Sequence, residues 1–243
     1  MSMHASGSCD QCSLKVLCLP VGLPETELWQ LDEIVQRRRP ITKGQVLFRM
    51  GAPFVSVFAV RTGSLKTVLL SDDGTEQVTG FALAGELLGL DAINQGEHPV
   101  SAVALESTSV CEIPFDKLDG LAGQLPSFRQ HFMRTMSREI ASDESLLALL
   151  GQRSAEQRLA AFLLSLSTRF RARGLVADRF CLSMSRADIA NHLGLTQETI
   201  SRLFTQFRKQ GLIEIHTRDL RLINMDSLHR IAGIRFEPLS QIA

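Results

Sequence analysis

The stretch SRADIANHLGLTQETISRLFTQFRKQG, residues 185–211, decides how the C-terminal part of this chain folds. Ser185 and Asp188 stand three positions apart, which is the spacing of a capping box, and they predict the start of a short helix that ends at His192. Gly194 predicts a tight turn directly after that helix, because glycine takes positive φ without a steric penalty.

A second helix follows the turn. Thr196 predicts its N-cap, and Gly211 predicts its end after residues 197–210. Two short helices joined by a turn around glycine indicate a helix-turn-helix rather than an ordinary helical hairpin, and the second helix of such a unit enters the major groove of DNA. Residues 212–216 and 220–224 are able to pair as a hairpin beside it, which predicts the winged form.

The second helix has an apolar side, formed by Ile200, Leu203 and Phe204, that we expect to face inward. Arginine can donate to guanine O6 and N7, glutamate can accept from cytosine N4, and serine can touch a base edge or a phosphate. Basic residues at the end of the helix are more suited to phosphates. The candidate DNA-binding residues are Thr196, Gln197, Glu198, Ser201, Arg202, Arg208 and Lys209.

The net charge of zero hides an asymmetry along the chain. Residues 1–150 contain 12 Lys and Arg against 18 Asp and Glu, whereas residues 151–243 contain 14 against 8. An acidic half followed by a basic half is typical of a sensor joined to a nucleic-acid reader. Chance segregation of solvated charges explains the same counts, so charge alone leaves both interpretations open.

Upstream of the helix-turn-helix lies a long helical pattern that Pro126 opens and that runs to residue 151. Apolar residues recur in it in steps of three and four, which is the a/d seam of a coiled coil, and the expected partner is the same helix of a second subunit. Asp143 interrupts the apolar seam, so its carboxylate either repels its twin across the dimer or lies solvated at the rim. The predicted dimerisation residues are Met133, Met136, Ile140, Asp143, Leu147 and Leu150.

Between residues 41 and 114 the pattern changes to short apolar runs divided by turn residues such as Thr62-Gly63. Runs of this length and spacing predict an antiparallel all-β barrel or roll. Before it, residues 25–36 predict a short helix, and the run Arg37-Arg38-Arg39 at its end favours a solvated helix end over a nucleic-acid patch.

Near the N-terminus, Cys9, Cys12 and Cys18 follow the pattern C-x2-C-x5-C. Thiolates bind soft transition metals and iron–sulfur clusters, but three of them leave one position of a four-ligand site empty. Cys111, considered alone, is interpreted as a core cysteine. Cys181 is expected to pack near the helix-turn-helix.

The 243-residue chain has neither an apolar run long enough to span a bilayer nor a secretory signal at its start, so we expect a cytoplasmic protein with reduced thiols and no membrane partner. No Ser/His/Asp arrangement or carboxylate pair stands in a catalytic setting, and the histidines lack metal-ligand spacing. We therefore expect a protein that is not an enzyme.

Taken together, these motifs resemble the cyclic-AMP receptor protein superfamily, and within it the group of fumarate and nitrate reductase regulators (FNR) and the Anr regulators. The resemblance covers roughly residues 9–234. Three motifs carry it: the Cys9–Cys18 pattern, the strand Val110-Cys111-Glu112-Ile113-Pro114-Phe115, and Glu198-Thr199-Ile200-Ser201-Arg202. It implies an α+β fold with an N-terminal β-roll of the cyclic-nucleotide-binding, jelly-roll type, a long dimerisation helix and a C-terminal winged helix-turn-helix.

The resemblance also implies a function. Family members hold an oxygen-labile [4Fe–4S] cluster through cysteines that match Cys9, Cys12, Cys18 and Cys111. The intact cluster favours homodimerisation and binding to palindromic TTGAT-type sites, and oxygen reverses both. The residue that matches Asp143 resists dimerisation without the cluster, and RNA polymerase is the further partner.

The same comparison argues against a cyclic nucleotide as the signal. In the cyclic-AMP receptor, the segment that corresponds to Gly85–Leu90 ends in a Glu that holds the ribose, and here that position is Leu90. The Arg that meets the phosphate is matched by Val100. An anionic nucleotide would therefore lose its two main polar contacts.

The predicted domains are a cysteine segment (1–24), a β-roll sensor (25–125), a dimerisation helix (126–151) and a winged helix-turn-helix (152–243). Two alternatives stay open. In the first, the same thiols serve a regulator of nitric oxide or general redox state; in the second, they bind zinc in a structural protein.

Overall fold

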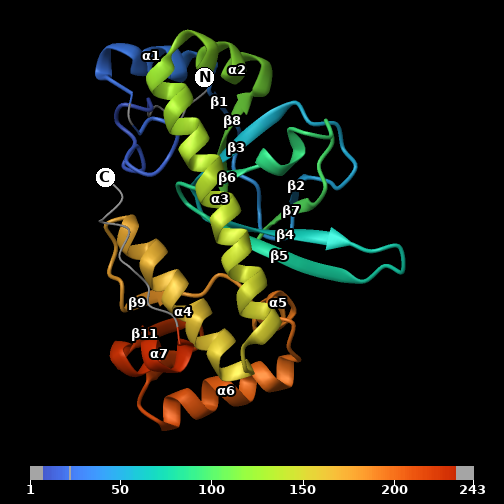
Figure 1. The fold of residues 1–243 in the computed structure, drawn as a ribbon, viewed down its shortest axis with the longest axis vertical. Helices are drawn as coiled ribbons and strands as arrows, with labels where there is room; N and C mark the ends of the chain where they lie inside the picture. Colours follow the sequence, from blue (N-terminus) through green and yellow to red (C-terminus); the bar gives the residue numbers. More distant parts are fainter. Residues whose placement is uncertain (1–7, 22, 234–243) are drawn as a thin grey trace. The chain divides into compact units, whose positions relative to one another are not determined.

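A computed structural model describes residues 8–21 and 23–233 of the protein, so the outermost residues of the predicted cysteine segment and of the predicted DNA-binding domain lie outside the described residues. The chain divides into two compact units, Met1–Ala141 and Ser142–Ala243. The long helix α3, Pro126–Gln152, begins in the first unit and ends in the second (Figure 1).

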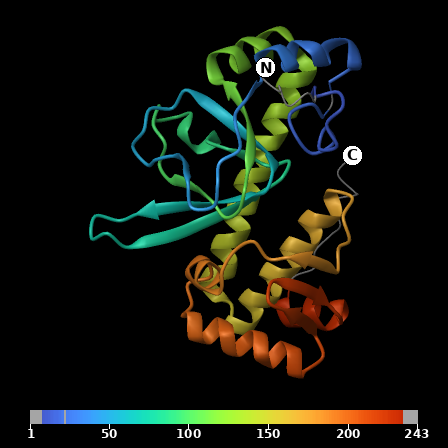
Figure 2. The ribbon, with the colours of Figure 1, turned by 180° about the vertical axis from the view of Figure 1, so that it is seen from behind.

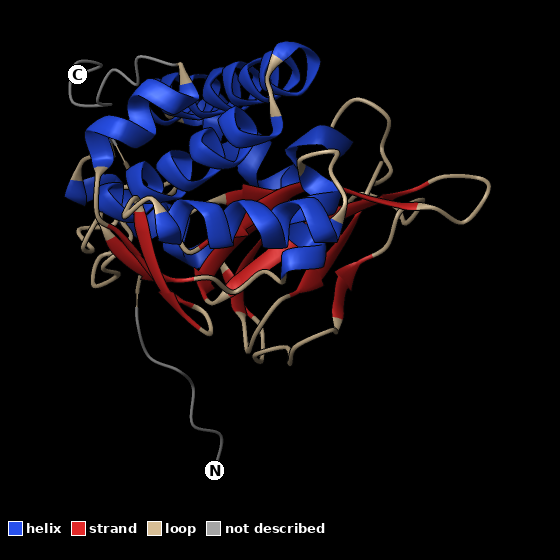
Figure 3. Ribbon diagram, turned by 90° about the horizontal axis from the view of Figure 1, so that it is seen from below, coloured by secondary structure: helices blue, strands red, loops and turns tan. Residues whose placement is uncertain are grey.

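The first unit contains the predicted roll. Its described strands form two four-stranded antiparallel sheets, in the orders β1-β8-β3-β6 and β2-β7-β4-β5, which are drawn in red in Figure 3. Figure 2 shows the hairpin of β4 and β5 extending beyond the rest of the roll. The strands are β1 (Gln36–Arg37), β2 (Val46–Phe48), β3 (Ser56–Thr62), β4 (Ser64–Leu70), β5 (Glu76–Leu83), β6 (Leu87–Leu88), β7 (Ser101–Ala104) and β8 (Ser109–Pro114).

Alternation along β3 separates two hydrophobic cores. Phe58 and Val60 point into the roll, where they join Phe48 and Leu65 from the other sheet. Val57 and Ala59 point to the opposite face of the same strand, since successive side chains of a strand face opposite ways, and they join a core that helices cover. Strand β3 thus contributes side chains both to the core inside the roll and to the core beneath the helices.

The predicted turn at Thr62-Gly63 is present and needs its glycine. Gly63 has φ of 79°, and a Cβ at this position would lie 2.5 Å from Thr108 Oγ1 and 2.6 Å from the carbonyl oxygen of Ser107. Both the positive φ and the close approach of the neighbouring backbone exclude a larger residue.

The helices of the first unit cover the outer face of the β1–β6 sheet. They are α1 (Glu25–Ile34), the short 3₁₀ helix η1 (Leu90–Ala92), α2 (Phe115–Gln124) and the first part of α3. Leu31 of α1, Leu118 of α2 and Phe128 of α3 are almost completely buried in the shared core. The sequence did not predict α2, because Gly120 and Gly123 weaken its helical pattern.

The interpretation of the arginine run as a solvated helix end was wrong. Helix α1 ends at Ile34, two residues earlier than predicted, and Gln36–Arg37 form β1, which pairs with β8. Arg37 pairs with Asp32, and Arg38 binds the carboxylate of Glu112, which is only 6% exposed. Two of the three arginines therefore pair with carboxylates instead of capping a helix.

The second unit is a winged helix-turn-helix, as predicted. Its described elements after α3 are α4 (Ala155–Ala172), β9 (Arg179–Cys181), α5 (Arg186–His192), α6 (Gln197–Lys209), β10 (Ile213–His216), β11 (Asp219–Leu222) and α7 (Met225–Ala232). The predicted wing hairpin is the pair β10–β11, and β9 adds a third strand that the sequence did not predict. Cys181 lies on β9 and is exposed rather than packed. Over the described ranges, no helix combines the length and the apolar character needed to cross a membrane.

Candidate metal centre and nucleic-acid interface

The two helices of the helix-turn-helix begin at the residues that the sequence indicates. Ser185 Oγ accepts a hydrogen bond of 3.1 Å from the Asp188 amide, and Asp188 Oδ2 accepts one of 2.9 Å from the Ser185 amide. Thr196 Oγ1 caps α6 by accepting from the Thr199 amide at 3.1 Å. These bonds satisfy amides that a helix leaves unpaired at its start, and so fix where each helix begins.

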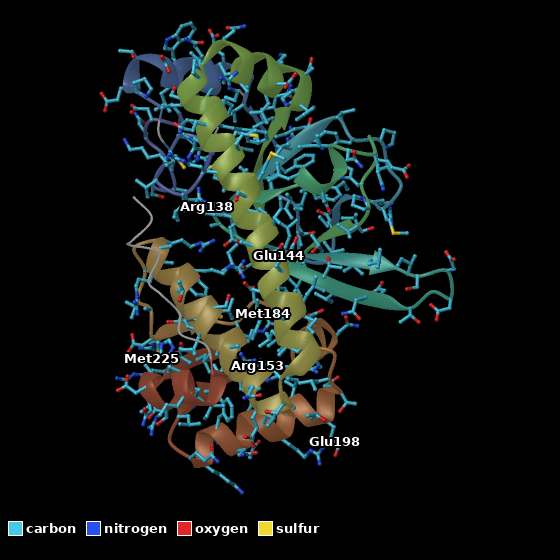
Figure 4. The ribbon with its side chains drawn as sticks, in the orientation of Figure 1. Arg138, Glu144, Arg153, Met184, Glu198 and Met225 are labelled. Atoms are coloured by element: carbon cyan, nitrogen blue, oxygen red, sulfur yellow. The ribbon has the colours of Figure 1, made fainter. Side chains whose placement is uncertain are left out.

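Helix α6 separates cleanly into a buried and an exposed side. Ile200, Leu203, Phe204 and Phe207 are buried. Glu198, labelled in Figure 4, lies near the start of the helix, and Arg202 one turn later is 3.9 Å from it, a loose pair that leaves both side chains largely exposed. All seven predicted DNA-binding residues are exposed: Thr196, Gln197, Glu198, Ser201, Arg202, Arg208 and Lys209.

Arg186, which the sequence did not indicate as a functional residue, lies beneath this surface. Its guanidinium carbon is 3.1 Å from the centroid of the Phe204 ring, and its buried Nη1 has no hydrogen-bond partner among the described residues. Burial lowers the pKa of Arg186 to about 10. Its position directly after the capping Ser185 is the only signal in the sequence that could have indicated it.

The cysteine segment is a series of turns rather than a regular element. The Cys12 amide donates to the Cys9 carbonyl at 3.3 Å, and the Cys18 amide donates to the Leu14 carbonyl at 3.0 Å. Leu19 is buried in the core of the first unit. A Cβ at Gly85, in the turn before β6, would lie 3.2 Å from the Leu17 Cβ, so the loop packs closely on that turn.

The carboxylate of Asp32 links Cys9 to strand β1 through two hydrogen bonds. Asp32 Oδ1 accepts from the Cys9 amide at 2.8 Å and from Arg37 Nη2 at 2.5 Å. Arg37 lies directly opposite Cys111 in the β1–β8 ladder, so their side chains leave the sheet on the same face. Burial alone would raise the pKa of Asp32, but the bonds from Cys9 and Arg37 outweigh it and lower the pKa below its ordinary value.

The structure brings the four predicted thiols to one region. Cys18 and Cys111 both pack against the helix-covered core, and all five cysteines of the chain are free thiols. The charge of Cys111 acts on the pKa values of Cys9 and Cys18, and that of Cys12 acts on those of Cys18 and Cys111. Cys111 is therefore a half-buried neighbour of the loop thiols. It also packs against the core, as its strand alone predicts.

Burial is the main cause of raised pKa values at these thiols. Burial, then hydrogen bonding with Asp32 and its charge, raises the pKa of Cys9 to about 12. Burial raises the pKa of Cys18 to about 12, and it also raises that of Cys111, where Arg37 and Arg61 partly oppose it. Such thiols are protonated at neutral pH, so a metal that binds them must displace their protons.

As they stand, the described side chains do not form a finished metal site: in residues 8–21 and 23–233, no group of three or more His, Cys, Asp or Glu could hold a metal ion. The donor set itself fits an iron–sulfur cluster, because four free cysteines from a short loop and a neighbouring strand are the ligands such clusters take. The loop has no regular secondary structure that would prevent its thiols from closing on one centre.

The predicted seam of α3 is largely exposed in the single chain. Met133, Ile140 and Leu147 are 60%, 59% and 70% exposed, and Asp143 is exposed in the same line. Met136 instead packs partly against the core of its own unit. Large apolar side chains in one line on a helix are typical of a protein interface.

Leu90 and Val100, the two residues of the roll that bear on nucleotide binding, are both apolar. Leu90 begins η1, and Val100 is only 8% exposed. His98, whose ring lies beside Gly89, is 3% exposed and stacks on Phe48 with ring centroids 3.9 Å apart.

Comparisons with known proteins agree with this architecture. Residues 157–231 match the family model "Crp-like helix-turn-helix domain", and residues 38–124 match "Cyclic nucleotide-binding domain". The chain is similar to the solved structure of FixK2 from Bradyrhizobium japonicum, with a TM-score of 0.76 and 30% identity over 83% of this chain and 99% of that one.

Two curated relatives extend along nearly the whole chain. The transcriptional activator protein Anr of Pseudomonas aeruginosa is 51% identical over 229 residues, which are 94% of each chain. The fumarate and nitrate reduction regulatory protein of Escherichia coli is 48% identical over 225 residues, 93% of this chain and 90% of the relative. Both names describe regulators rather than enzymes. The chain therefore belongs to the Crp/Fnr family of helix-turn-helix transcription regulators, in the group that contains FNR and Anr.

Proposed function

We propose that this regulator senses oxygen through a [4Fe–4S] cluster held by Cys9, Cys12, Cys18 and Cys111, and that the cluster controls homodimerisation and binding to palindromic TTGAT-type sites. The observation that carries the proposal is that Cys18 of the loop and Cys111 of β8 pack against one hydrophobic core, with Cys9 and Cys12 near enough for the thiol charges to act on one another. The names of the relatives, which concern fumarate, nitrate and transcription activation, support a role in the anaerobic response.

When bound, the cluster supplies an oxygen-labile redox centre. The residues of the protein supply the ligands and the surroundings of the cluster. Cys111 would provide one ligand from strand β8, and Cys9, Cys12 and Cys18 would provide three from the loop of turns. Leu17 lies beside the ligand Cys18 and packs on Gly85, and we assign it a role in limiting the access of solvent to the cluster. Access and neighbouring groups set the stability of such a centre.

The raised pKa values bear on the redox alternative. Direct oxidation of a cysteine proceeds through its thiolate, and burial makes thiolates scarce at Cys9 and Cys18. These raised pKa values disfavour Cys9 and Cys18 as the thiolates that would begin disulfide formation in a sensor of general redox state. Nitric oxide as the signal and zinc as a structural metal remain the competing functions of the same thiols.

The output of the switch is DNA reading by α6. We assign base contacts to Glu198, Ser201 and Arg202, whose exposed side chains share one face, with Thr196 and Gln197 at the helix start. Arg208 and Lys209 at the helix end meet phosphates. Losing a phosphate contact weakens binding to all sequences and reduces its salt dependence, whereas losing a base contact relaxes the specificity at one position.

Dimerisation uses the exposed seam of α3. Met133, Ile140 and Leu147 bury their apolar side chains against the second subunit, with Met136 and Leu150 at the edges of the contact. Asp143 opposes this association through repulsion between the paired carboxylates. We further assign RNA polymerase as a partner and the cytoplasm as the location. We also propose that no cyclic nucleotide is the signal, because the apolar Leu90 and Val100 stand at the two positions where the cyclic-AMP receptor holds its ligand through Glu and Arg.

The metal content of anaerobically purified protein tests this proposal. The wild type should contain about four iron and four sulfide per chain, and each of Cys9→Ser, Cys12→Ser, Cys18→Ser and Cys111→Ser should lose most of both. Cys181→Ser is the matched control, because Cys181 is an exposed thiol on the wing sheet.

Zinc without sulfide in the wild type would instead establish the structural-metal alternative. Retention of iron in Cys111→Ser would show that Cys111 of β8 is not a ligand. Comparing the rates at which oxygen and nitric oxide bleach the protein separates the remaining two signals.

A further inference from the structure

The joint between the dimerisation helix and the DNA-reading domain is very short. Helix α3 ends at Gln152 and α4 begins at Ala155, so only Arg153 and Ser154 lie between them. The last part of α3, from Ser142, belongs to the same compact unit as the helix-turn-helix. Each residue contributes two soft backbone dihedrals, and four such dihedrals are enough to swing one helix relative to the other unless something holds them.

Arg158, in the first turns of α4, holds this joint from inside. Its Nη2 donates to the Leu150 carbonyl at 2.7 Å, its Nε to the Arg153 carbonyl at 3.0 Å and its Nη1 to the Leu193 carbonyl at 2.9 Å. Carbonyls at helix C-termini lack intrahelical partners and carry partial negative charge. The planar guanidinium is the side chain that can reach three such oxygens in a fixed fork.

The three acceptors belong to three different parts of the output machinery. Leu150 is in the last turn of α3, Arg153 is the joint itself, and Leu193 is the C-cap of α5, the first helix of the helix-turn-helix. Gly194, at φ of 62°, follows directly, and a Cβ there would lie 3.4 Å from Arg158 Nη1. The turn of the helix-turn-helix is thus fitted closely around this arginine.

Helix α4 reaches the recognition helix as well. Glu156 Oε1 accepts a hydrogen bond of 2.6 Å from Gln206 Nε2 on α6. By contrast Arg153, labelled in Figure 4, directs its guanidinium to the end of α7, with bonds of 3.4 Å to the carbonyls of Ala232 and Gly233. Arg158 instead joins the end of α3 directly to the helix-turn-helix.

We propose that Arg158 is a positioning residue that fixes the recognition helix relative to the dimerisation helix and thereby sets the half-site spacing that the dimer accepts. This inference rests on the proposed function, since it requires a dimer on a palindrome. The two recognition helices of such a dimer must enter major grooves about 34–36 Å apart. A loose joint spreads the orientation of each helix, so the dimer loses affinity for the correct spacing and discriminates less against wrong ones.

The test uses the full chain purified anaerobically, with the variants Arg158→Met and Arg158→Lys. Lysine keeps the charge but lacks the planar fork, so both variants should behave alike. Arg171→Met is the matched control, because Arg171 lies in the last turn of the same helix and is exposed. Binding is measured to a duplex with two inverted TTGAT half-sites, to the same duplex with one or two extra central base pairs, and to a single half-site.

For the Arg158 variants we expect at least a tenfold loss of affinity for the palindrome, and a preference for the correct spacing that falls by a similar factor. Affinity for the single half-site and the dimer fraction in sedimentation should change less than twofold. Arg171→Met should match the wild type in all four measurements.

Wild-type affinity and spacing preference in Arg158→Met would overturn the inference. So would an equal loss on half-site and palindrome, or a loss of dimer, because Arg158 would then hold the domain fold, the DNA or the subunit contact. A wild type that binds none of the duplexes would contradict the proposed function itself, which is a different outcome.

Discussion

Asp32 holds the first cysteine of the loop to the sheet, so replacing Asp32 should loosen the loop even when no metal is bound. The carboxylate accepts from the Cys9 amide at 2.8 Å and from Arg37 at 2.5 Å. Hydrogen bonds to a charged group contribute about 1.5–3 kcal/mol when they are shielded from water. The Arg37 bond stays formed when the loop opens, so only the Cys9 bond opposes opening. Because the side chain of Asp32 is 29% exposed, that bond contributes at the low end of this range, about 1.5 kcal/mol.

For Asp32→Ala, about 1.5 kcal/mol corresponds to roughly a tenfold larger population of the open loop. Asp32→Asn keeps an acceptor for the Cys9 amide but replaces a charged acceptor with a neutral one, so its effect should be about threefold. The assay is hydrogen–deuterium exchange of the Cys9 amide in the reduced, metal-free protein, because amide exchange reports local opening and is independent of thiol ionisation.

Glu33→Ala is the matched control, since Glu33 is the next residue of α1 and is exposed. Its Cys9 exchange should equal that of the wild type. If Asp32→Ala exchanged within twofold of the control, the carboxylate would not be the anchor of the loop.

Three further changes test other parts of the molecule. Asp143→Ala should strengthen dimerisation in air by about tenfold, because it removes the repulsion between the two carboxylates, and sedimentation showing an unchanged monomer would contradict this. Burial lowers the pKa of His98 in the folded protein. As the pH falls below about 6.5, His98 is protonated in the unfolded chain before it is protonated in the folded one, so the free energy of unfolding decreases on acidification. His98→Gln should flatten that pH dependence in urea unfolding, and an identical slope would refute the assignment. Phe128→Ala should cost about 3–5 kcal/mol, because Phe128 is fully buried, whereas Met133→Ala on the exposed side of the same helix should change the unfolding free energy of the metal-free monomer little.

The DNA-reading half of the molecule follows from local sequence signals. Ser185, Thr196 and Gly194 each satisfy a requirement within a few residues, so caps and turn appear where predicted. The apolar period of α6 identifies its buried side in the same way. Arg186 was missed, because its contact with the Phe204 ring depends on how two helices cross.

The sensor half depends more on long-range contacts. The strands of the roll were predicted from their spacing, but β1 exists because residues 36–37 find a partner in β8, far along the chain. Helix α2 forms despite two glycines because Leu118 and Leu121 complete the core. No local pattern encodes either pairing.

The thiol site likewise contains residues that the sequence indicates and residues that only the fold reveals. The spacing of Cys9, Cys12 and Cys18 is visible in the sequence, whereas Cys111 by itself gives only the signal of a core residue. Asp32 and Arg37 carry no motif. Their role emerges only when α1 and β1 bring them between the loop and β8.

The most direct test of the central claim is a simultaneous record of visible absorbance and DNA binding as air enters a sample of anaerobically purified protein. A labelled duplex with inverted TTGAT half-sites reports binding by fluorescence anisotropy. We expect a brown protein whose absorbance and anisotropy fall together at the same rate, with the Cys111→Ser variant colourless and unbound from the start. A protein that binds the duplex with full affinity while colourless, or that keeps its affinity after bleaching, would contradict the account.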